Sequence, residues 1–292
     1  MSIDLSQLPA PAIIEASDFE TLLAERKASF LALCTEDERA EMAARLALES
    51  DPIAKLLQES TYRELLLRQR INESARAVML AFAGSGDLDH IGANYEVQRL
   101  ADEPDAAYRA RIQLSFEGFS TAGPEGAYRF HALSADARVL DASAYSPREA
   151  DGRPSGRVII TALSREEGGV ASDELIATVT AALNHEEVRP LTDALEVQPA
   201  EQLDFQVHAT LYTLSGPDRQ VVLDTARAQL DAYIADRYRL GRDVSLSGLF
   251  RALHAEGTQR VVMASPVADI VTDQTQAARC TGITIEFGGT DD

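Results

Sequence analysis

The sequence predicts an α+β protein in which a helical N-terminal region precedes two small α+β units. Up to about residue 133, apolar residues recur at spacings of three and four, which is the period of a helix with one buried face. Residues 158–163 form a run rich in β-branched side chains, as in a buried strand. Residues 203–211 alternate between apolar and polar side chains, which predicts a strand with one buried face.

The helical region is expected to begin after an extended arm that runs to about residue 16 and contains Pro9 and Pro11. Ser17 has the residue type and position of an N-cap for the first helix, and a second helix is expected to start at Thr35. Asp51 and Pro52 then suit the cap and first turn of the longest helix, which we expect to continue to about residue 82.

The longest helix is predicted to bury one face. The side chains that indicate this face are Leu67, Ile71, Ala75, Val78 and Phe82. The segment Gly84-Ser85-Gly86 is interpreted as the end of this helix. It begins like a dinucleotide-binding fingerprint, but it follows a helix and lacks the third glycine. Further helices are expected at about residues 87–95, 105–116 and 124–133.

The two α+β units are predicted from strand and helix signals that alternate after residue 133. Strands are expected near residues 139–144, 158–163, 195–197, 203–211, 260–263 and 283–287. Ser172 and Ser245 have the positions of N-caps for helices between them. The expected division is therefore 1–133, 134–200 and 201–292. A ferredoxin-like split β-α-β fold is one form that each unit could take.

The charge balance argues against nucleic acid and membranes as partners. The chain has 27 Lys and Arg residues against 47 Asp and Glu residues, and its formal net charge is −20. Binding to phosphate backbones and anionic lipids depends on an excess of basic side chains, which this sequence lacks. A basic protein surface is a better match for such a charge.

The cysteines and the N-terminus indicate a soluble protein of a reducing cytosol. Cys34 and Cys280 have no spacing typical of a zinc site, and a bridge between them is the less favoured alternative. The N-terminal residues are acidic and no apolar h-region follows them. No run of about 18 apolar residues, the length needed to span a bilayer, is present.

The sequence contains no motif that requires catalysis, a metal or a cofactor. Nucleophile-elbow, phosphate-loop and zinc-protease patterns are absent. His185 is placed at a helix end, where its charge suits the dipole, and Asp87-Leu88-Asp89-His90 suits a helix start better than a calcium loop. We therefore expect no enzyme activity and no cofactor.

One basic cluster differs from the acidic background. It lies on the longest helix and comprises Arg63, Arg68, Arg70 and Arg76. Two interpretations remain open: a solvated face with intrahelical ion pairs, or a docking face for an acidic surface such as another copy of the chain. Arginine suits the second role because its planar guanidinium pairs with carboxylates through two hydrogen bonds.

Several segments, in order along nearly the whole chain, resemble the baseplate J-like proteins of contractile phage tails and R-type bacteriocins. These segments are residues 62–72, 118–131, 189–193, 238–244 and 280–283. The resemblance implies a structural wedge protein of the baseplate. Such proteins surround the central hub, join neighbouring wedges and help to trigger sheath contraction.

The resemblance also implies partners and a location. The expected partners are further copies of the chain, the smaller wedge protein similar to tail protein I, and the wedge protein with a lysozyme-like fold that contacts the sheath. Assembly is expected in the bacterial cytoplasm, and the final location in the tail baseplate. No cofactor or catalytic residue comes with this family.

Two interfaces follow as hypotheses. We expect the longest helix, about residues 52–82, to pack against a partner helix within one wedge, because it combines arginines with apolar side chains. The unit 201–292 is expected to carry contacts between wedges. Its candidate interface residues are His208, on the polar face of a strand, and Tyr212.

Two other classes of function are alternatives. A pair of ferredoxin-like units could form a small-molecule sensor, by analogy of fold alone. A hydrolase could use carboxylates such as Glu166, Glu167 or Asp204, although no substrate is indicated.

Overall fold

The computed structural model describes Leu5 and residues 8–120, 123–149, 151–153, 155–166, 168–216 and 218–290. Its contacts divide the chain into two compact units, Met1–Gln98 and Arg99–Asp292. Much of the expected N-terminal arm, residues 1–4, 6 and 7, lies outside the described residues. Cys34 and Cys280 are free thiols. Within the described ranges, no helix combines the length and apolar character needed to cross a bilayer.

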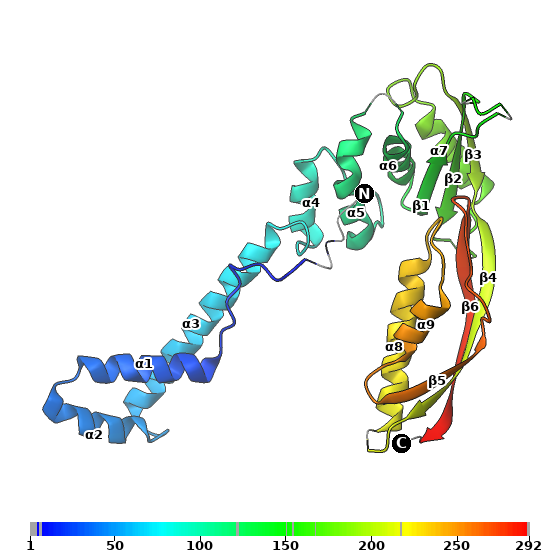
Figure 1. Cartoon of the computed structure of the whole chain (residues 1–292). Helices are drawn as coiled ribbons and strands as arrows, with labels where there is room; N and C mark the ends of the chain where they lie inside the picture. The colour runs from blue at the N-terminus through cyan, green and yellow to red at the C-terminus, as the bar shows by residue number, and fades with distance from the viewer. Residues whose placement is uncertain are drawn as a thin grey trace. The chain divides into compact units, whose positions relative to one another are not determined.

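The first unit consists of helices in its described part. They are α1 (Phe19–Leu33), α2 (Glu36–Leu46), α3 (Pro52–Ala77) and α4 (Ser85–Ala93). Helix α1 packs across α3 and buries Leu22 and Leu23, while α3 buries Ala54 and Thr61 (Figure 1). The side of α3 that bears Ala54 and Thr61 is therefore the covered side.

Local capping explains where these helices start. Asp51 caps α3 as predicted: its carboxylate accepts the Ile53 N–H at 2.7 Å, and Pro52 occupies the first turn. The prediction of Ser17 as the cap of α1 was wrong by one residue. Asp18 is the cap, because its carboxylate lies 2.8 Å from the Thr21 N–H and also accepts the Thr21 hydroxyl.

Helix α3 ends at Ala77 and not near residue 82. After Ala77 the chain forms turns whose backbone hydrogen bonds join residues three positions apart, such as Met79 N–H to Arg76 O at 3.1 Å. The interpretation of Gly84-Ser85-Gly86 as a helix end was also wrong. Gly84 is the N-cap of α4, and Ser85 has a φ of 47° in the sharp turn that opens this helix.

The predicted buried stripe on the longest helix is mostly exposed. The exposed fractions are 64% for Leu67, 61% for Ile71, 76% for Val78 and 42% for Phe82. The spacing was that of an amphipathic helix, but α1 covers the other side of α3. Periodicity predicts that a face can be buried, not which neighbour buries it.

The second unit contains two sheets, each covered by helices. Its first part comprises α5 (Asp105–Gly118), α6 (Glu125–Ala135), β1 (Val139–Tyr145), β2 (Arg157–Ser164), α7 (Asp173–Leu183) and β3 (Ala194–Pro199). The sheet order is β1-β2-β3, antiparallel between β1 and β2 and parallel between β2 and β3. Tyr128 of α6 and Leu175 of α7 pack on Ala142 and Ile160 of the sheet.

The second sheet has the order β5-β4-β6. Its elements are β4 (Glu201–Thr213), α8 (Arg219–Arg237), α9 (Leu246–Leu253), β5 (Thr258–Ser265) and β6 (Gln276–Thr290). The alternation predicted for β4 is confirmed, since Phe205, Val207, Ala209 and Leu211 are all buried. Helices α8 and α9 lie along the sheet and contribute Leu230 and Leu249 to this core (Figure 1).

The α+β fold class is thus confirmed, with a helical N-terminal region followed by α+β units. Ser172 and Ser245 cap α7 and α9 as predicted. Within the described residues each sheet has three strands, whereas a ferredoxin-like unit has four. The borders at 133/134 and 200/201 stay predictions about separately folding units.

Candidate functional site

The four arginines of the predicted cluster do not share one face of α3. Arg68 lies on the side of α1, where it pairs with Glu64 at 2.8 Å and with Glu15 at 2.9 Å. Glu64 also pairs with Arg26 of α1. Hydrogen bonds from Arg68, and secondly from Arg26, lower the pKa of Glu64. Arg68 is therefore occupied by contacts within the first unit and is not free to pair with a partner.

Arg63 and Arg70 lie on the opposite side of the helix, seven residues apart. Arg63 pairs with Glu59 at 2.8 Å and Arg70 lies 3.7 Å from Glu73, and both side chains are more than 70% exposed. Arg76 is exposed in the last turn of the helix. These pairs within one exposed helix contribute little to stability.

The same side of α3 carries large apolar side chains that no described residue of the first unit covers. We call it the outer α3 face, and its members are Leu56, Tyr62, Arg63, Leu66, Leu67, Arg70 and Ile71. Its apolar members are between 42% and 66% exposed. A soluble monomer rarely exposes apolar side chains in such a continuous row, so the outer α3 face has the character of an interface.

The two candidate residues of the second sheet lie on the outward side of β4. His208 is exposed and pairs in register with Ser265 of β5 and Thr284 of β6. Tyr212 is half-buried, because the Arg260 guanidinium lies 3.9 Å from its ring centroid. This cation–π contact leaves Tyr212 less accessible than its position on the polar face predicts.

The structure adds a site that the sequence did not predict, the joint between the two sheets. Its apolar seam consists of Leu163, Ala200 and Ala277, with Leu140, Tyr238 and Leu240 packed around them. Polar contacts flank the seam. The Asp141 carboxylate of β1 accepts the Leu240 N–H at 3.2 Å, and the Ser143 hydroxyl donates to Gln274 O at 2.5 Å. The joint therefore combines a small apolar seam with polar contacts, as do interfaces between domains that can change their arrangement.

The turn between β2 and α7 crosses this joint. Arg279 of β6 donates to Gly168 O at 2.9 Å, and the Gln202 amide of β4 donates to Gly169 O at 3.3 Å. Arg279 also forms two 2.7 Å hydrogen bonds with Asp204, which lower the pKa of that carboxyl. The pair Gly168-Gly169 was the one signal in the sequence for this turn.

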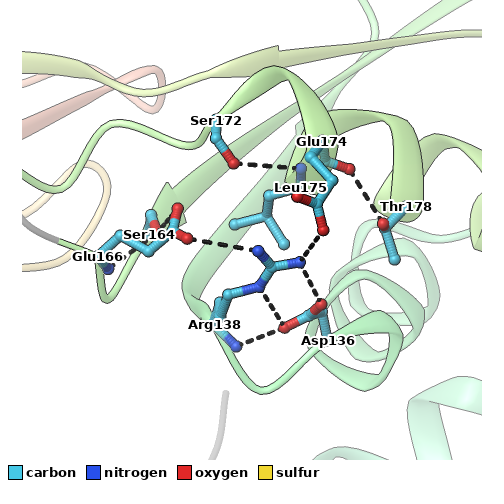
Figure 2. A network of polar contacts seen from close by, with 8 residues as sticks. All are labelled: Asp136, Arg138, Ser164, Glu166, Ser172, Glu174, Leu175 and Thr178. Carbon is cyan, nitrogen blue, oxygen red and sulfur yellow. Dashed lines mark hydrogen bonds and ion pairs between the residues drawn. The ribbon is translucent and has the colours of Figure 1, made fainter.

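Figure 2 shows how Arg138 fixes the same turn from the side of the first sheet. Its guanidinium contacts Asp136 at 2.9 Å, Glu174 at 3.2 Å and Glu166 at 3.4 Å. Hydrogen bonds from Arg138 lower the pKa of Asp136, and Asp136 first and then Glu174 raise the pKa of Arg138. Arg138 therefore acts as the cross-link between the start of β1 and the turn after β2.

Replacing Gly169 by alanine is expected to loosen the joint. Gly169 has a φ of 74° and a Cβ there would overlap the Tyr238 hydroxyl. The control is Gly152→Ala, which has a similar φ of 83° but open space around its Cβ. The left-handed backbone costs about 1 kcal/mol in both variants, and overlap adds about 1–3 kcal/mol in Gly169→Ala alone. Urea unfolding measures the difference; equal losses would contradict a tight contact.

A cleft of about 480 Å³ opens at the joint, between the turn after β2 and the C-terminal part of α8. Leu140, Ile234 and Cys280 contribute to its lining. Burial raises the pKa of the Cys280 thiol and also that of Tyr238. A thiol with a raised pKa is a poor nucleophile at neutral pH.

Of the carboxylates named for a hydrolase, Asp204 lacks the environment of a general acid, because hydrogen bonds from Arg279 lower its pKa. Glu166 contacts Arg138, and Asp204 is held ionised by Arg279. A general acid at neutral pH needs a raised pKa. Glu167 lies outside the described residues. Among the described residues, no group of three or more His, Cys, Asp or Glu side chains could hold a metal ion.

Comparison with known proteins gives matches along most of the chain. Residues 49–105 match the Baseplate J-like N-terminal domain, residues 120–199 the Baseplate J-like central domain, and residues 205–286 the Baseplate J-like protein C-terminal domain. Baseplate protein J of Escherichia phage P2 is 49% identical over 305 aligned positions, which cover 99% of both chains.

Proposed function

Because this chain belongs to the baseplate J-like family and is a structural protein of a contractile-tail baseplate, we propose that it is a wedge subunit. In this role it joins neighbouring wedges around the central hub and helps to trigger sheath contraction. The family is structural, and we propose that the chain has no catalytic role. It assembles with other baseplate proteins in the bacterial cytoplasm and remains in the tail particle.

The outer α3 face is the observation that carries this proposal. Helix α3 has 26 residues. Helix α1 covers one side of it, and the outer α3 face on the other side is apolar and exposed. A helix of this length offers about seven turns for packing. We propose that a helix of a wedge partner, such as the smaller protein similar to tail protein I, packs there. Arg63 and Arg70 would pair with acidic side chains at its rim.

Contacts between wedges are assigned to the second sheet, with His208 and Tyr212 as candidate residues. The outward side of β4 presents polar side chains and a Tyr212–Arg260 stack. Polar interfaces of moderate size are easier to break and re-form than apolar cores, and sheath contraction requires interfaces with two arrangements. Another copy of the chain and the wedge protein with a lysozyme-like fold are the proposed partners here.

Co-expression with the gene immediately downstream tests the proposal. We expect a stable hetero-oligomer that contains more than one copy of this chain, and native mass determination gives its stoichiometry. A wedge subunit must bind another wedge protein, so a monomer that binds no product of the neighbouring genes would contradict the proposal.

A further inference from the structure

The lining of the cleft at the joint combines apolar side chains with two arginines, Arg165 and Arg279. The apolar or weakly polar part of the lining comprises Leu140, Ile234, Ala235 and Cys280. Arg165, which follows directly after β2, also lines the cleft. The walls come from both sheets of the second unit. A group bound in this cleft would therefore contact both sheets at once.

The two carboxylates that the structure describes in the cleft lining are already paired with other arginines. Glu166 contacts Arg138, and Asp231 is bound by Arg227 at 2.9 Å. Arg279, the second arginine of the lining, is occupied by Asp204 and by Gly168 O. None of these acidic groups remains to neutralise Arg165.

Arg165 has no carboxylate partner among the described residues. Its Nε donates to Ala137 O at 3.0 Å, which leaves its two terminal nitrogens without a bonded partner in the described part of the chain. Burial of its guanidinium lowers the pKa of Arg165, and the nearby Arg239 lowers it further. Arg239 donates to Tyr238 O, a neutral group. The carboxylate of Glu103 raises the pKa of Arg165 in part, but Glu103 is itself bound by Arg111 through two hydrogen bonds of 2.7 Å. Among the described residues, neither Arg165 nor Arg239 forms an ion pair, and two such neighbouring guanidinium groups attract an anion.

We propose that this cleft binds a glutamate side chain of another baseplate protein, with Arg165 pairing its carboxylate. This assignment rests on the proposed function. A single carboxylate on a methylene stem matches the cleft, because the stem packs on the apolar lining while the two oxygens meet the terminal nitrogens of Arg165. The bound side chain bridges the two sheets and fixes the joint in one arrangement.

Complementation of a contractile particle that lacks this gene tests the proposal. Arg165→Glu reverses the charge, Arg165→Lys keeps it, and Arg148→Glu is the matched control. Arg148 is also exposed and donates to one backbone oxygen, Gly152 O. Loss of a charge pair that is buried in an interface weakens binding by about 100-fold or more. We therefore expect Arg165→Glu to lower the number of active particles by about 100-fold or more. Arg148→Glu should remain within about threefold of wild type. Arg165→Lys should fall between the two, because the lysine ammonium keeps the charge but lacks the planar geometry that pairs both carboxylate oxygens.

Equal activity of Arg165→Glu and Arg148→Glu would overturn the proposal. So would a melting temperature of Arg165→Glu well below that of Arg148→Glu, because the loss would then come from folding. Suppressors of Arg165→Glu found only within residues 99–292 of this chain would also overturn it, because they would indicate a contact within the chain. A suppressor that changes a glutamate of another baseplate protein to lysine or arginine would support it and identify the partner. If the wild-type gene itself does not restore particles, the proposed function fails instead, which separates the two questions.

Discussion

Arg111→Met is expected to destabilise the second unit strongly. Arg111 and Glu103 are both buried, with side chains 5% and 3% exposed. They form two hydrogen bonds of 2.7 Å, and Arg111 also donates to the Ser134 hydroxyl at 3.1 Å. Removing the arginine leaves Glu103 as a buried charge without its partner. Such a loss costs about 3–5 kcal/mol.

The matched control for this prediction is the double variant Arg111→Met with Glu103→Leu. It replaces both charges by apolar groups of similar size, so most of the stability should return. Thermal unfolding measures both variants. For a unit of this size, each kcal/mol lowers the melting temperature by about 2–4 °C. A single variant that melts like wild type, or a double variant as unstable as the single one, would show that the pair does not support the fold.

The combined change Arg63→Glu and Arg70→Glu is expected to abolish co-purification with the wedge partner. Both arginines lie on the outer α3 face, and reversing two charges at an interface places like charges opposite the acidic groups of the partner. We expect binding to weaken by at least about 100-fold, which corresponds to about 2.7 kcal/mol. Arg68 is excluded from this test because it pairs with Glu64 and Glu15 within the first unit.

The control for this prediction is the exchange Glu59→Arg with Arg63→Glu. It preserves the ion pair within the helix and the net charge while it moves the positive charge by one turn. We expect the exchange variant to fold normally and to bind more weakly than wild type but better than the double reversal. Unchanged co-purification of the double reversal would show that the outer α3 face remains exposed to solvent in the wedge.

Local features of the sequence were sufficient to predict most elements of the fold. The caps at Asp51, Ser172 and Ser245 and the alternation along β4 depend on neighbours within a few residues, and all were confirmed. The resemblance to baseplate J-like proteins was confirmed as well. One error occurred where two local signals competed, for Ser17 and Asp18 at the start of α1. Another, the buried stripe on the longest helix, arose because α1 covers the other side of α3.

The candidate sites were predicted less completely. Arg63, Arg68, Arg70 and Arg76 were correctly expected on one long helix, but the structure divides Arg68 from Arg63 and Arg70. His208 is exposed as expected, whereas Tyr212 is partly covered by Arg260. Whether these residues form interfaces stays a prediction. Arg138 and Arg165 had no distinguishing pattern in the sequence, because isolated arginines are common on acidic proteins.

The sequence by itself determined the helices, the strands and the family, since periodicity, capping and motif order are local or ordered along the chain. Only the tertiary structure decided which side of α3 is covered and how the two sheets meet. The contact between Arg279 and Gly168 joins residues 111 positions apart, and its geometry depends on the packing of both sheets. Such a contact is fixed by the sum of many packing interactions, so no short segment of the sequence encodes it.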